Sequence, residues 1–329
     1  YRTFLNEGIT PVVPSRGSIG DADITLASHV GATMMGEWKV TVNGKVISSA
    51  DALKAKGITP LVPQGKDGLG SLSTNSVGVA MLMNAMQTMR QAVKVTPTVF
   101  GLTLEGLNGN VAPFLAQTVN SHPLLGLQEA AKNFREELKG SYLWTFDKTR
   151  NLQDPLSFRT TVYTYSEALR ALTELDALVN IQINSSDDNP GVILNASKED
   201  YDSTQVAQYF VDAEGLKGAI IPSANFEPLP IAISAERAAI ALAHVAHNCV
   251  QRTIRLNRSA DNIIDLYSME LLHSTQAIDL RRAQQDNVKL SPKTEALYKA
   301  YRAKVPFVDK DRIFSGDLEE GISILKNWR

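Results

Sequence analysis

The sequence is poor in the features that mark several large classes of protein. It has one cysteine, Cys249, in 329 residues, so no disulfide framework can form within the chain, and this composition fits a reducing compartment. The formal net charge of −2 gives no electrostatic footprint for nucleic acid or for an acidic membrane. No apolar run reaches about 18 residues, so we expect no transmembrane span. The sequence begins at Tyr1 without a signal-peptide pattern, and we expect a cytoplasmic protein.

Strand signals are also few, whereas helical signals are abundant. One hairpin is predicted in residues 39–47, where Asn43-Gly44 suits a two-residue turn between β-branched residues. Residues 101–110 are rich in turn formers and predict a break in the helical pattern. Helices are predicted over residues 50–56, 75–93, 113–118, 126–138, 166–183, 232–256, 258–282 and 318–328, and apolar residues recur near helical spacing in 75–93 and 166–183. The pattern predicts a mainly α protein, a bundle of long helices with a small β-hairpin element.

The stretch from Gly17 to Ile24 is unusual in this packing-rich chain. Its small residues Gly17, Ser18 and Gly20 allow close approach of backbones. Two carboxylates, Asp21 and Asp23, follow immediately. On local grounds the ordinary interpretation is a turn with acidic residues at a helix start.

Polar loops next to long helices supply the other candidate site residues. Arg159, in the loop 153–159, can bind a carboxylate through two hydrogen bonds, although a helix-surface ion pair is the simpler alternative. Residues 187–190, Asp-Asp-Asn-Pro, are explained by a turn that ends a helix better than by a metal loop. His244 and His247 share a helix face without an HExxH pattern, so we expect no metal site.

Taken together, these segments resemble the histidine/phenylalanine ammonia-lyase superfamily of aromatic amino acid lyases. The matching motifs run in order along the chain: Gly17-Ser18-Ile19-Gly20, Gly36-Glu37, Lys66-Asp67-Gly68-Leu69, Gln153-Asp154 with Ser157-Phe158-Arg159, Ser186 to Pro190, Asn225-Phe226, and Gln276 to Arg281. The resemblance implies the long-helix bundle of the ammonia-lyase/fumarase-like type and a homotetramer with active sites shared between subunits. It implies that Arg159 clamps the substrate carboxylate, that Asn189 hydrogen-bonds the same end, and that Phe226 lines the aryl pocket.

The sequence departs from this superfamily at the cofactor. Members that use the electrophilic methylideneimidazolone (MIO) group build it from Ala-Ser-Gly directly after the Gly-Ser-x-Gly motif. Here Asp21-Ala22-Asp23 stands in that place, so Ser18, Gly20, Asp21, Ala22 and Asp23 are the equivalent of the cofactor loop. A modified residue omitted after Gly20 is the alternative, but restoring it leaves surplus residues before His29. The Asn that supports the cofactor in the family pattern falls on Ser73, which we place among the substrate-binding residues. We therefore expect no MIO cofactor.

A substrate that needs no electrophile would explain the departure. A quaternary trimethylammonium is already a good leaving group and has no lone pair with which to attack an electrophile. The branch of the superfamily that fits is that of the ergothionases, which release trimethylamine from ergothioneine to give thiolurocanate. Asp21, Asp23 or Glu227 would then face the cationic head, and Phe226 would add a cation–π contact. The expected partner is a small molecule, ergothioneine or a related aryl betaine.

The resemblance also indicates missing parts. We expect residues 1–329 to form a single lyase domain that lacks an N-terminal part and a loop between Asn257 and Arg258. The catalytic base of the family, a Tyr, belongs to the N-terminal part, so the base is not assigned to any residue of this chain. Two rival interpretations stay open: an MIO-dependent histidine or aromatic amino acid ammonia-lyase, and a catalytically inactive structural homologue.

Overall fold

The structure, a computed structural model, describes residues 1–17, 23–198, 203–253, 263–285, 288–309 and 314–328, and of residues 263–266 only the backbone. Its α-helices are α1 (Arg2–Glu7), α2 (Ile24–Met34), α3 (Ser49–Ala55), α4 (Asp67–Gly70), α5 (Ser76–Leu107), α6 (Ala116–Asn120), α7 (Leu127–Glu137), α8 (Leu156–Arg159), α9 (Thr161–Ile183), α10 (Thr204–Ala207), α11 (Leu229–Arg252), α12 (Ile263–Gln284), α13 (Pro292–Arg302) and α14 (Ser315–Asn327). Two 3-10 turns are η1 (Ala112–Phe114) and η2 (Tyr142–Trp144), and the strands are β1 (Thr10–Pro11), β2 (Lys39–Val42), β3 (Lys45–Ser48), β4 (Gly191–Leu194), β5 (Phe210–Ala213) and β6 (Leu216–Ile221). The predicted mainly α architecture is confirmed.

The chain divides into two compact units. The first comprises Tyr1–Asn84 and Ala177–Ile233, and the second comprises Ala85–Asp176 and Ser234–Arg329. Helices α5, α9 and α11 contribute residues to both units. The single lyase domain expected over residues 1–329 stays a prediction, and the expected gap between Asn257 and Arg258 lies outside the described residues.

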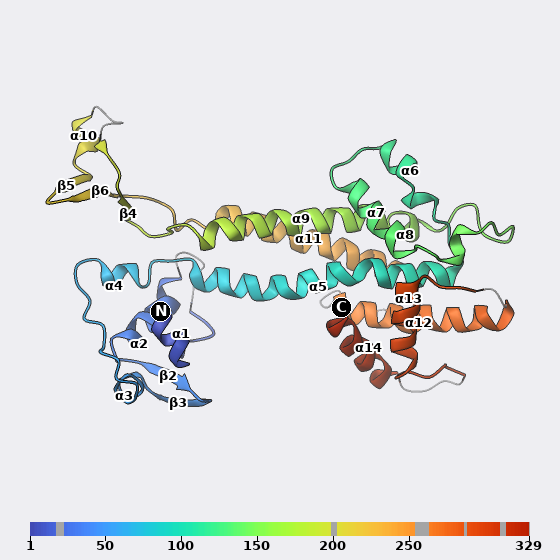
Figure 1. Ribbon diagram of the computed structural model, residues 1–329, viewed down its shortest axis with the longest axis horizontal. Coiled ribbons are helices and arrows are strands. Elements are labelled where there is room, and N and C mark those ends of the chain that lie inside the picture. Colours follow the sequence, from blue (N-terminus) through green and yellow to red (C-terminus); the bar gives the residue numbers. More distant parts are fainter. Residues whose placement is uncertain (18–22, 199–202, 254–262, 286–287, 310–313, 329) are drawn as a thin grey trace. The chain divides into compact units, whose positions relative to one another are not determined.

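The predicted hairpin lies in the first unit (Figure 1). Strands β2 and β3 pair with Val42 opposite Lys45, and Asn43 and Gly44 take left-handed φ values of 50° and 75°. These are the dihedrals that a type I′ turn requires. The short strand β1 joins the other edge of β2. The N-cap of α3 is Ser48, whose hydroxyl accepts from the backbone N–H of Asp51.

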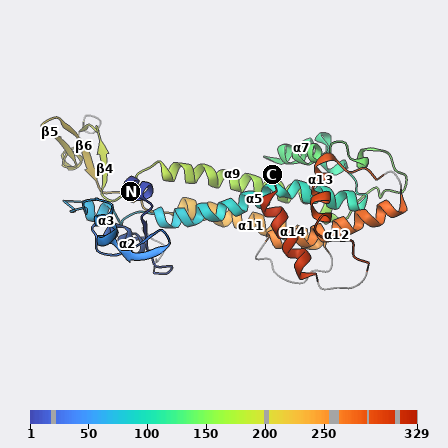
Figure 2. The same cartoon turned by 60° about the horizontal axis from the view of Figure 1, so that its bottom comes forward.

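A second sheet in this unit, with strand order β4-β6-β5, was not predicted from the sequence (Figure 2). All its pairings are antiparallel, and Glu214 and Gly215, with φ of 48° and 84°, make the turn between β5 and β6. Its apolar residues are half exposed; Val192 and Ile193, for example, face opposite sides of β4 and are 51% and 48% exposed. The alternation of buried and polar residues that reveals a strand in sequence is therefore weak here.

In the second unit, α5 continues without interruption to Leu107, so the predicted break at residues 101–110 is wrong for its first seven residues. The glycines there serve close packing. A Cβ on Gly101 would lie 3.1 Å from Thr294 Cγ2, and one on Gly106 would lie 3.1 Å from the carbonyl oxygen of Ser274. Helices can keep such glycines where a neighbouring chain segment approaches closely.

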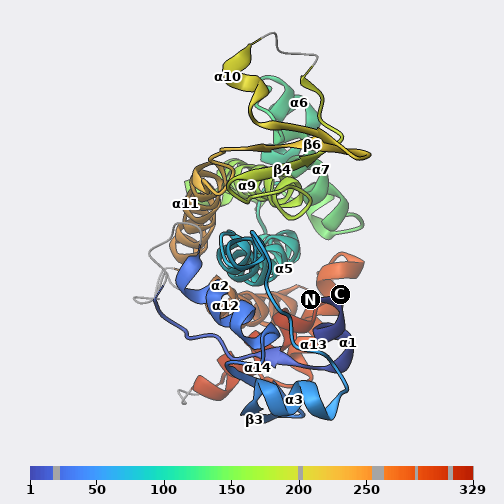
Figure 3. The same ribbon diagram turned by 90° about the vertical axis from the view of Figure 1, so that its left-hand side faces the viewer.

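The core of the second unit is partly aromatic. Phe100 of α5 makes edge contacts with Phe114 and Phe134, whose ring centroids lie 5.5 and 5.1 Å away. Figure 3, in which α5, α9 and α11 are seen nearly end-on, shows these three helices side by side.

Helix α13 was not predicted from the sequence. Its N-cap is Ser291, whose side-chain oxygen accepts from the backbone N–H of Thr294.

Helix α11 is long and apolar. By length and composition alone it could cross a membrane, and it is the one such helix among the described residues. Core helices of soluble proteins share these properties. Two arginines of α11 form ion pairs with other helices of the second unit, Arg237 with Glu174 and Arg252 with Glu270. These pairs fit a helix that packs inside a protein bundle.

Candidate functional site

Arg159 is the last residue of α8 and is held in place by the loop that precedes it. Its Nε donates to the backbone carbonyl of Asp154 at 2.8 Å. Because a guanidinium only donates hydrogen bonds, the side-chain amide of Gln153 turns its oxygen toward Arg159. This oxygen accepts from Nη1 at 2.6 Å and from Nη2 at 2.9 Å. The outer edge of the guanidinium, which would bind a carboxylate, thus faces a neutral acceptor.

Asp154 anchors the loop on its other side. Its carboxylate oxygen Oδ2 accepts the backbone N–H of Asn110 at 2.6 Å, and the residue is 3% exposed. The second oxygen, Oδ1, has no hydrogen-bond partner within the part of the chain that the structure describes. Burial raises the pKa of this carboxyl above its ordinary value, against the opposing effect of the Asn110 hydrogen bond.

Arg159 lines a cavity of about 370 Å³, and all the residues that line this cavity belong to the second unit. Tyr163, in the first turn of α9, lines the same cavity. The cavity therefore places a cation that can bind a carboxylate beside an aromatic ring that can face a second cation. Its lining residues are Asn110, Ala112, Pro113, Thr118, Leu152, Gln153, Asp154, Arg159 and Tyr163.

In the first unit, two carboxylates cap the start of α5. Asp187 Oδ2 accepts the backbone N–H of Asn75 at 2.7 Å and the hydroxyl of Thr74 at 3.0 Å. Asp23 Oδ2 accepts the backbone N–H of Gly78 at 2.6 Å. Negative charge at this position satisfies N–H groups that have no partner within the helix and favours the helix dipole. The ordinary interpretation of Asp23, helix capping, is thus confirmed, but the helix that it caps through its side chain is α5.

Three predicted residues of the first unit belong to this same polar neighbourhood. Asn75 Nδ2 donates to the carbonyl of Phe226, which ties the predicted aryl-pocket residue to the start of α5. The Asn189 side-chain oxygen accepts the backbone N–H of Ser223 at 2.8 Å. Ser73 is buried, with 7% exposure. Next to Asn189, the carboxylate of Asp188 forms an ion pair with Lys66.

Glu227, predicted to face a cationic substrate, is exposed and has a capping contact. One of its carboxylate oxygens accepts the backbone N–H of Leu229, the first residue of α11, at 2.9 Å. Of the cofactor-loop equivalent, Ser18, Gly20, Asp21 and Ala22 lie outside the described residues. Asp23 is described, and its carboxylate accepts the backbone N–H of Gly78 at the start of α5.

The structure therefore places Ser73, Asn189 and Phe226 in the first unit, whereas Arg159 belongs to the second unit. Sequence reasoning missed Gln153 and Tyr163 as residues of the Arg159 cavity. Gln153 was part of a quoted motif, whereas Tyr163 lies beyond the junction between α8 and α9, and its sequence position gave no signal of the cavity. No group of three or more His, Cys, Asp or Glu side chains in the described ranges could hold a metal ion.

Comparison with known proteins tests the resemblance directly. The family model of the aromatic amino acid lyases matches residues 1–262. The chain belongs to the aromatic amino acid lyase family. This membership supports a carbon–nitrogen lyase with a small-molecule substrate, and it accounts for the sequence order of the motifs that include Ser18, Arg159 and Asn189.

Curated members of the family that resemble the chain include histidine ammonia-lyases. That of Geobacillus thermodenitrificans is 27% identical over 364 aligned positions, which cover 96% of this chain and 71% of the relative. Since this chain has 329 residues, the relative carries additional residues inside the matched region. The enzyme of Geobacillus kaustophilus is 31% identical over 77% of this chain, and the match covers 46% of that relative.

Among solved structures, the ergothioneine-degrading ergothionase from Treponema denticola, in complex with desmethyl-ergothioneine sulfonic acid, has a TM-score of 0.82 and 28% identity. The match covers 99% of this chain and 74% of the ergothionase. Tyrosine aminomutase from Streptomyces globisporus, at 22% identity and a TM-score of 0.78, shares the fold over 98% of this chain and 73% of its own. The chain thus has the ammonia-lyase fold and resembles ergothionase.

Proposed function

We propose that this aromatic amino acid lyase eliminates trimethylamine from ergothioneine, the trimethyl betaine of 2-thiohistidine, and forms thiolurocanate without an MIO cofactor. The observation that carries the proposal is the stretch Asp21-Ala22-Asp23, which stands where MIO-dependent relatives have Ala-Ser-Gly.

The reaction chemistry explains why the electrophile is dispensable. A base removes the β-proton, the C–H electron pair becomes the new carbon–carbon double bond, and the Cα–N bond breaks. Trimethylamine leaves as a neutral molecule with the former bonding pair. The primary ammonium of an amino acid is a poorer leaving group. In MIO-dependent relatives, the MIO group activates this amine for departure. The base is expected on a Tyr outside this chain.

The Arg159 cavity supports a betaine substrate. In ergothioneine the carboxylate and the trimethylammonium are bonded to the same carbon, so groups that bind them must be neighbours in the site. Arg159 and Tyr163 are such neighbours, since both line one cavity. The guanidinium would bind the carboxylate through paired hydrogen bonds, and the Tyr163 ring would face the quaternary ammonium. The 28% identity to an ergothionase over nearly the whole chain adds to this support.

A second candidate is an MIO-dependent histidine ammonia-lyase, which the names of the curated relatives favour. An inactive homologue with a structural role is a third. A homotetramer with shared active sites and a cytoplasmic location complete the proposal, with Ser73, Asn189, Phe226 and Glu227 as further substrate-binding residues.

The test uses the full gene-encoded protein with ergothioneine and, in parallel, with histidine. We expect trimethylamine and a rise in near-ultraviolet absorbance from the conjugated product, an unmodified intact mass, and no turnover of histidine. Release of ammonia from histidine, together with an intact mass that has lost two waters, would establish the MIO-dependent lyase instead. Failure with ergothioneine, other aryl betaines and histidine would leave the structural homologue.

A further inference from the structure

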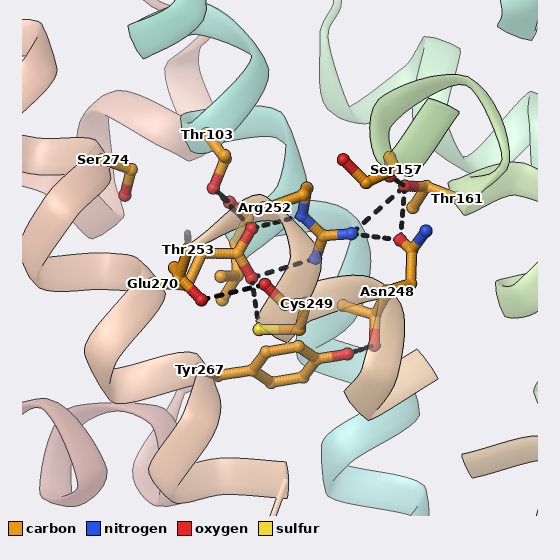
Figure 4. Close-up of polar contacts among 12 residues, drawn as sticks. Thr103, Ser157, Thr161, Asn248, Cys249, Arg252, Thr253, Tyr267, Glu270 and Ser274 are labelled. Carbon is orange, nitrogen blue, oxygen red and sulfur yellow. Dashed lines mark hydrogen bonds and ion pairs between the residues drawn. The ribbon is translucent and has the colours of Figure 1, made fainter. Parts of the chain in front are cut away.

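A buried polar network joins Thr161, Asn248, Arg252 and Glu270 (Figure 4). The two residues that follow Arg159 are Thr160 and Thr161, and both contact Asn248 of α11. Asn248 Nδ2 donates to the Thr160 hydroxyl at 3.1 Å, and its Oδ1 accepts from the Thr161 hydroxyl at 2.8 Å. One side chain of α11 thus bonds both residues at the junction between α8 and α9.

The Thr160 hydroxyl also holds α8 against the start of α9. Thr160 Oγ1 donates to the carbonyl of Leu156 at 2.7 Å, and Thr161 Oγ1 is 2.8 Å from the carbonyl of Ser157. Leu156 and Ser157 are residues of α8, the four-residue helix that ends at Arg159. Asn248 therefore bonds the Thr160 hydroxyl, which in turn is hydrogen-bonded to Leu156 of α8. Through this hydroxyl it acts on the position of α8 and of Arg159.

Asn248 is itself fixed by a buried ion pair. Arg252, one turn further along α11, donates from Nη1 to Asn248 Oδ1 and, at 3.2 Å, to Thr161 Oγ1. Its Nε and Nη2 donate to Oε1 and Oε2 of Glu270 at 2.6 and 2.9 Å. The side chains of Arg252 and Glu270 are each 1% exposed.

Glu270 has further donors that leave it little freedom. The Thr103 hydroxyl donates to Oε1 at 2.8 Å, and the Cys249 thiol donates to Oε2 at 2.9 Å. A buried ion pair is weak evidence for added stability, because desolvation offsets most of the attraction between the charges. A fully bonded network does, however, hold its members in one geometry.

We propose that Asn248 is a positioning residue for Arg159: the Glu270–Arg252–Asn248 chain fixes the α8–α9 junction so that the guanidinium faces the cavity in the orientation that binds a substrate carboxylate. The proposal rests on the proposed function in one respect, that Arg159 binds a carboxylate. A displacement of about 1 Å in such a group can cost about a hundredfold in rate or binding.

The matched pair of variants is Asn248→Ala and Tyr267→Phe. The Tyr267 hydroxyl is bonded to the buried Thr96 hydroxyl, and within the described part of the chain it makes no hydrogen bond to Thr160 or Thr161. Steady-state kinetics are measured with ergothioneine and with its carboxamide, which lacks the carboxylate charge. We expect N248A to raise the KM for ergothioneine about ten- to hundredfold with a smaller change in kcat. The KM for the carboxamide should stay within about twofold of wild type, and Y267F should lower Tm without raising either KM.

Thr160→Val gives a second measurement on the same junction. It removes the hydroxyl that Asn248 Nδ2 reaches, and the N248A/T160V pair should be non-additive in KM because both changes break one contact. Additive effects, equal KM increases for acid and carboxamide, or a KM increase in Y267F as large as in N248A would each overturn the proposal.

Hydrogen exchange separates this proposal from the proposed function. Backbone amides of residues 156–162 should exchange faster in N248A than in Y267F at matched stability. If wild type neither binds nor converts ergothioneine, the proposed substrate is wrong, and the exchange comparison still decides whether Asn248 holds the junction. Unchanged exchange at residues 156–162 in N248A would refute the positioning role.

Discussion

The amide oxygen of Gln153 lies 2.6 Å from Nη1 and 2.9 Å from Nη2 of Arg159, the two nitrogens with which an arginine binds a carboxylate. A neutral oxygen there is a weaker partner than a carboxylate, because hydrogen bonds between charged groups are about twice as strong. A substrate carboxylate can therefore displace the amide at a modest cost.

Gln153→Glu turns this relationship into a test. The new carboxylate has the same shape and would pair with Arg159 permanently, so the substrate would have to compete with it. We expect the KM for ergothioneine to rise at least about tenfold with little change in kcat. Gln153→Leu is the control, since it removes the amide without adding charge, and its KM should stay well below that of Q153E. Equal values for the two variants would show that the fork of Arg159 is not where the carboxylate binds.

The aromatic ring of Tyr163 should contribute to binding of the quaternary ammonium of ergothioneine. Tyr163→Phe keeps the aromatic ring, whereas Tyr163→Leu removes its attraction for a cation, worth about 0.5–2 kcal/mol. We expect Y163L to raise the KM for ergothioneine roughly 2- to 30-fold and Y163F to leave it nearly unchanged. Isothermal titration calorimetry with ergothioneine would show whether the loss is in binding. Similar losses in both variants would point to the hydroxyl and not to the ring.

Asp23 should matter for stability before it matters for turnover. Its contact with the Gly78 N–H caps α5 at 2.6 Å, and loss of a capping side chain costs about 1 kcal/mol. Asp23 has a φ of 44°, a left-handed conformation that Asn tolerates better than Ala. We therefore expect D23A to lower Tm by several degrees and D23N by less, with urea unfolding as an independent check.

The alternative role for Asp23 leaves a different signature. If its charge faced the cationic head of the substrate, D23N would raise KM while leaving Tm close to that of wild type. The two variants thus separate capping from substrate recognition, because Asn keeps the acceptor and loses only the charge.

Glu105 should make the stability of the second unit depend on pH. It is fully buried on α5, and it accepts the backbone N–H of Ser291 at 2.8 Å and the hydroxyl of Thr294. Burial raises the pKa of its carboxyl to about 7 from an ordinary value of 4.5, against the opposing effect of these hydrogen bonds. Between these two values the native state holds a proton that the unfolded state releases. Stability therefore falls as pH rises through that window and levels off above about pH 7.

Glu105→Gln is the matched variant, because it mimics the protonated carboxyl at every pH. Urea unfolding at several pH values from 4.5 to 8 should show the free energy of unfolding of wild type declining relative to E105Q by on the order of 2–3 kcal/mol. Parallel curves for the two proteins would contradict the raised pKa of Glu105.

Local chemistry decided which parts of the fold were predictable. The hairpin was predicted because Asn43-Gly44 fits one turn type, and α9 was predicted because its apolar residues repeat at helical spacing. The continuation of α5 was missed because Gly101 and Gly106 resemble turn residues until the packing against Thr294 and Ser274 is known. Such contacts join residues far apart in sequence, and no local pattern contains them.

The candidate site divides in the same way. Arg159 was predicted from its motif, and the structure adds the cavity with Tyr163 and the amide of Gln153 that faces the guanidinium. The role of Asn248 could not be predicted, because it depends on hydrogen bonds to Thr160 and Thr161, residues nearly ninety positions away in the chain. A single asparagine in an apolar helix has no sequence pattern that reveals its partner.

The burial of Cys249 gives the protein a natural reporter. As the one thiol of the chain, it lies fully enclosed against Glu270, and burial, reinforced by that carboxylate, raises its pKa well above the ordinary value. A thiol in this state does not react with alkylating reagents until α11 and α12 separate. The rate of labelling under native conditions therefore counts the openings of this helix pair, without any engineered probe and without dependence on catalytic turnover.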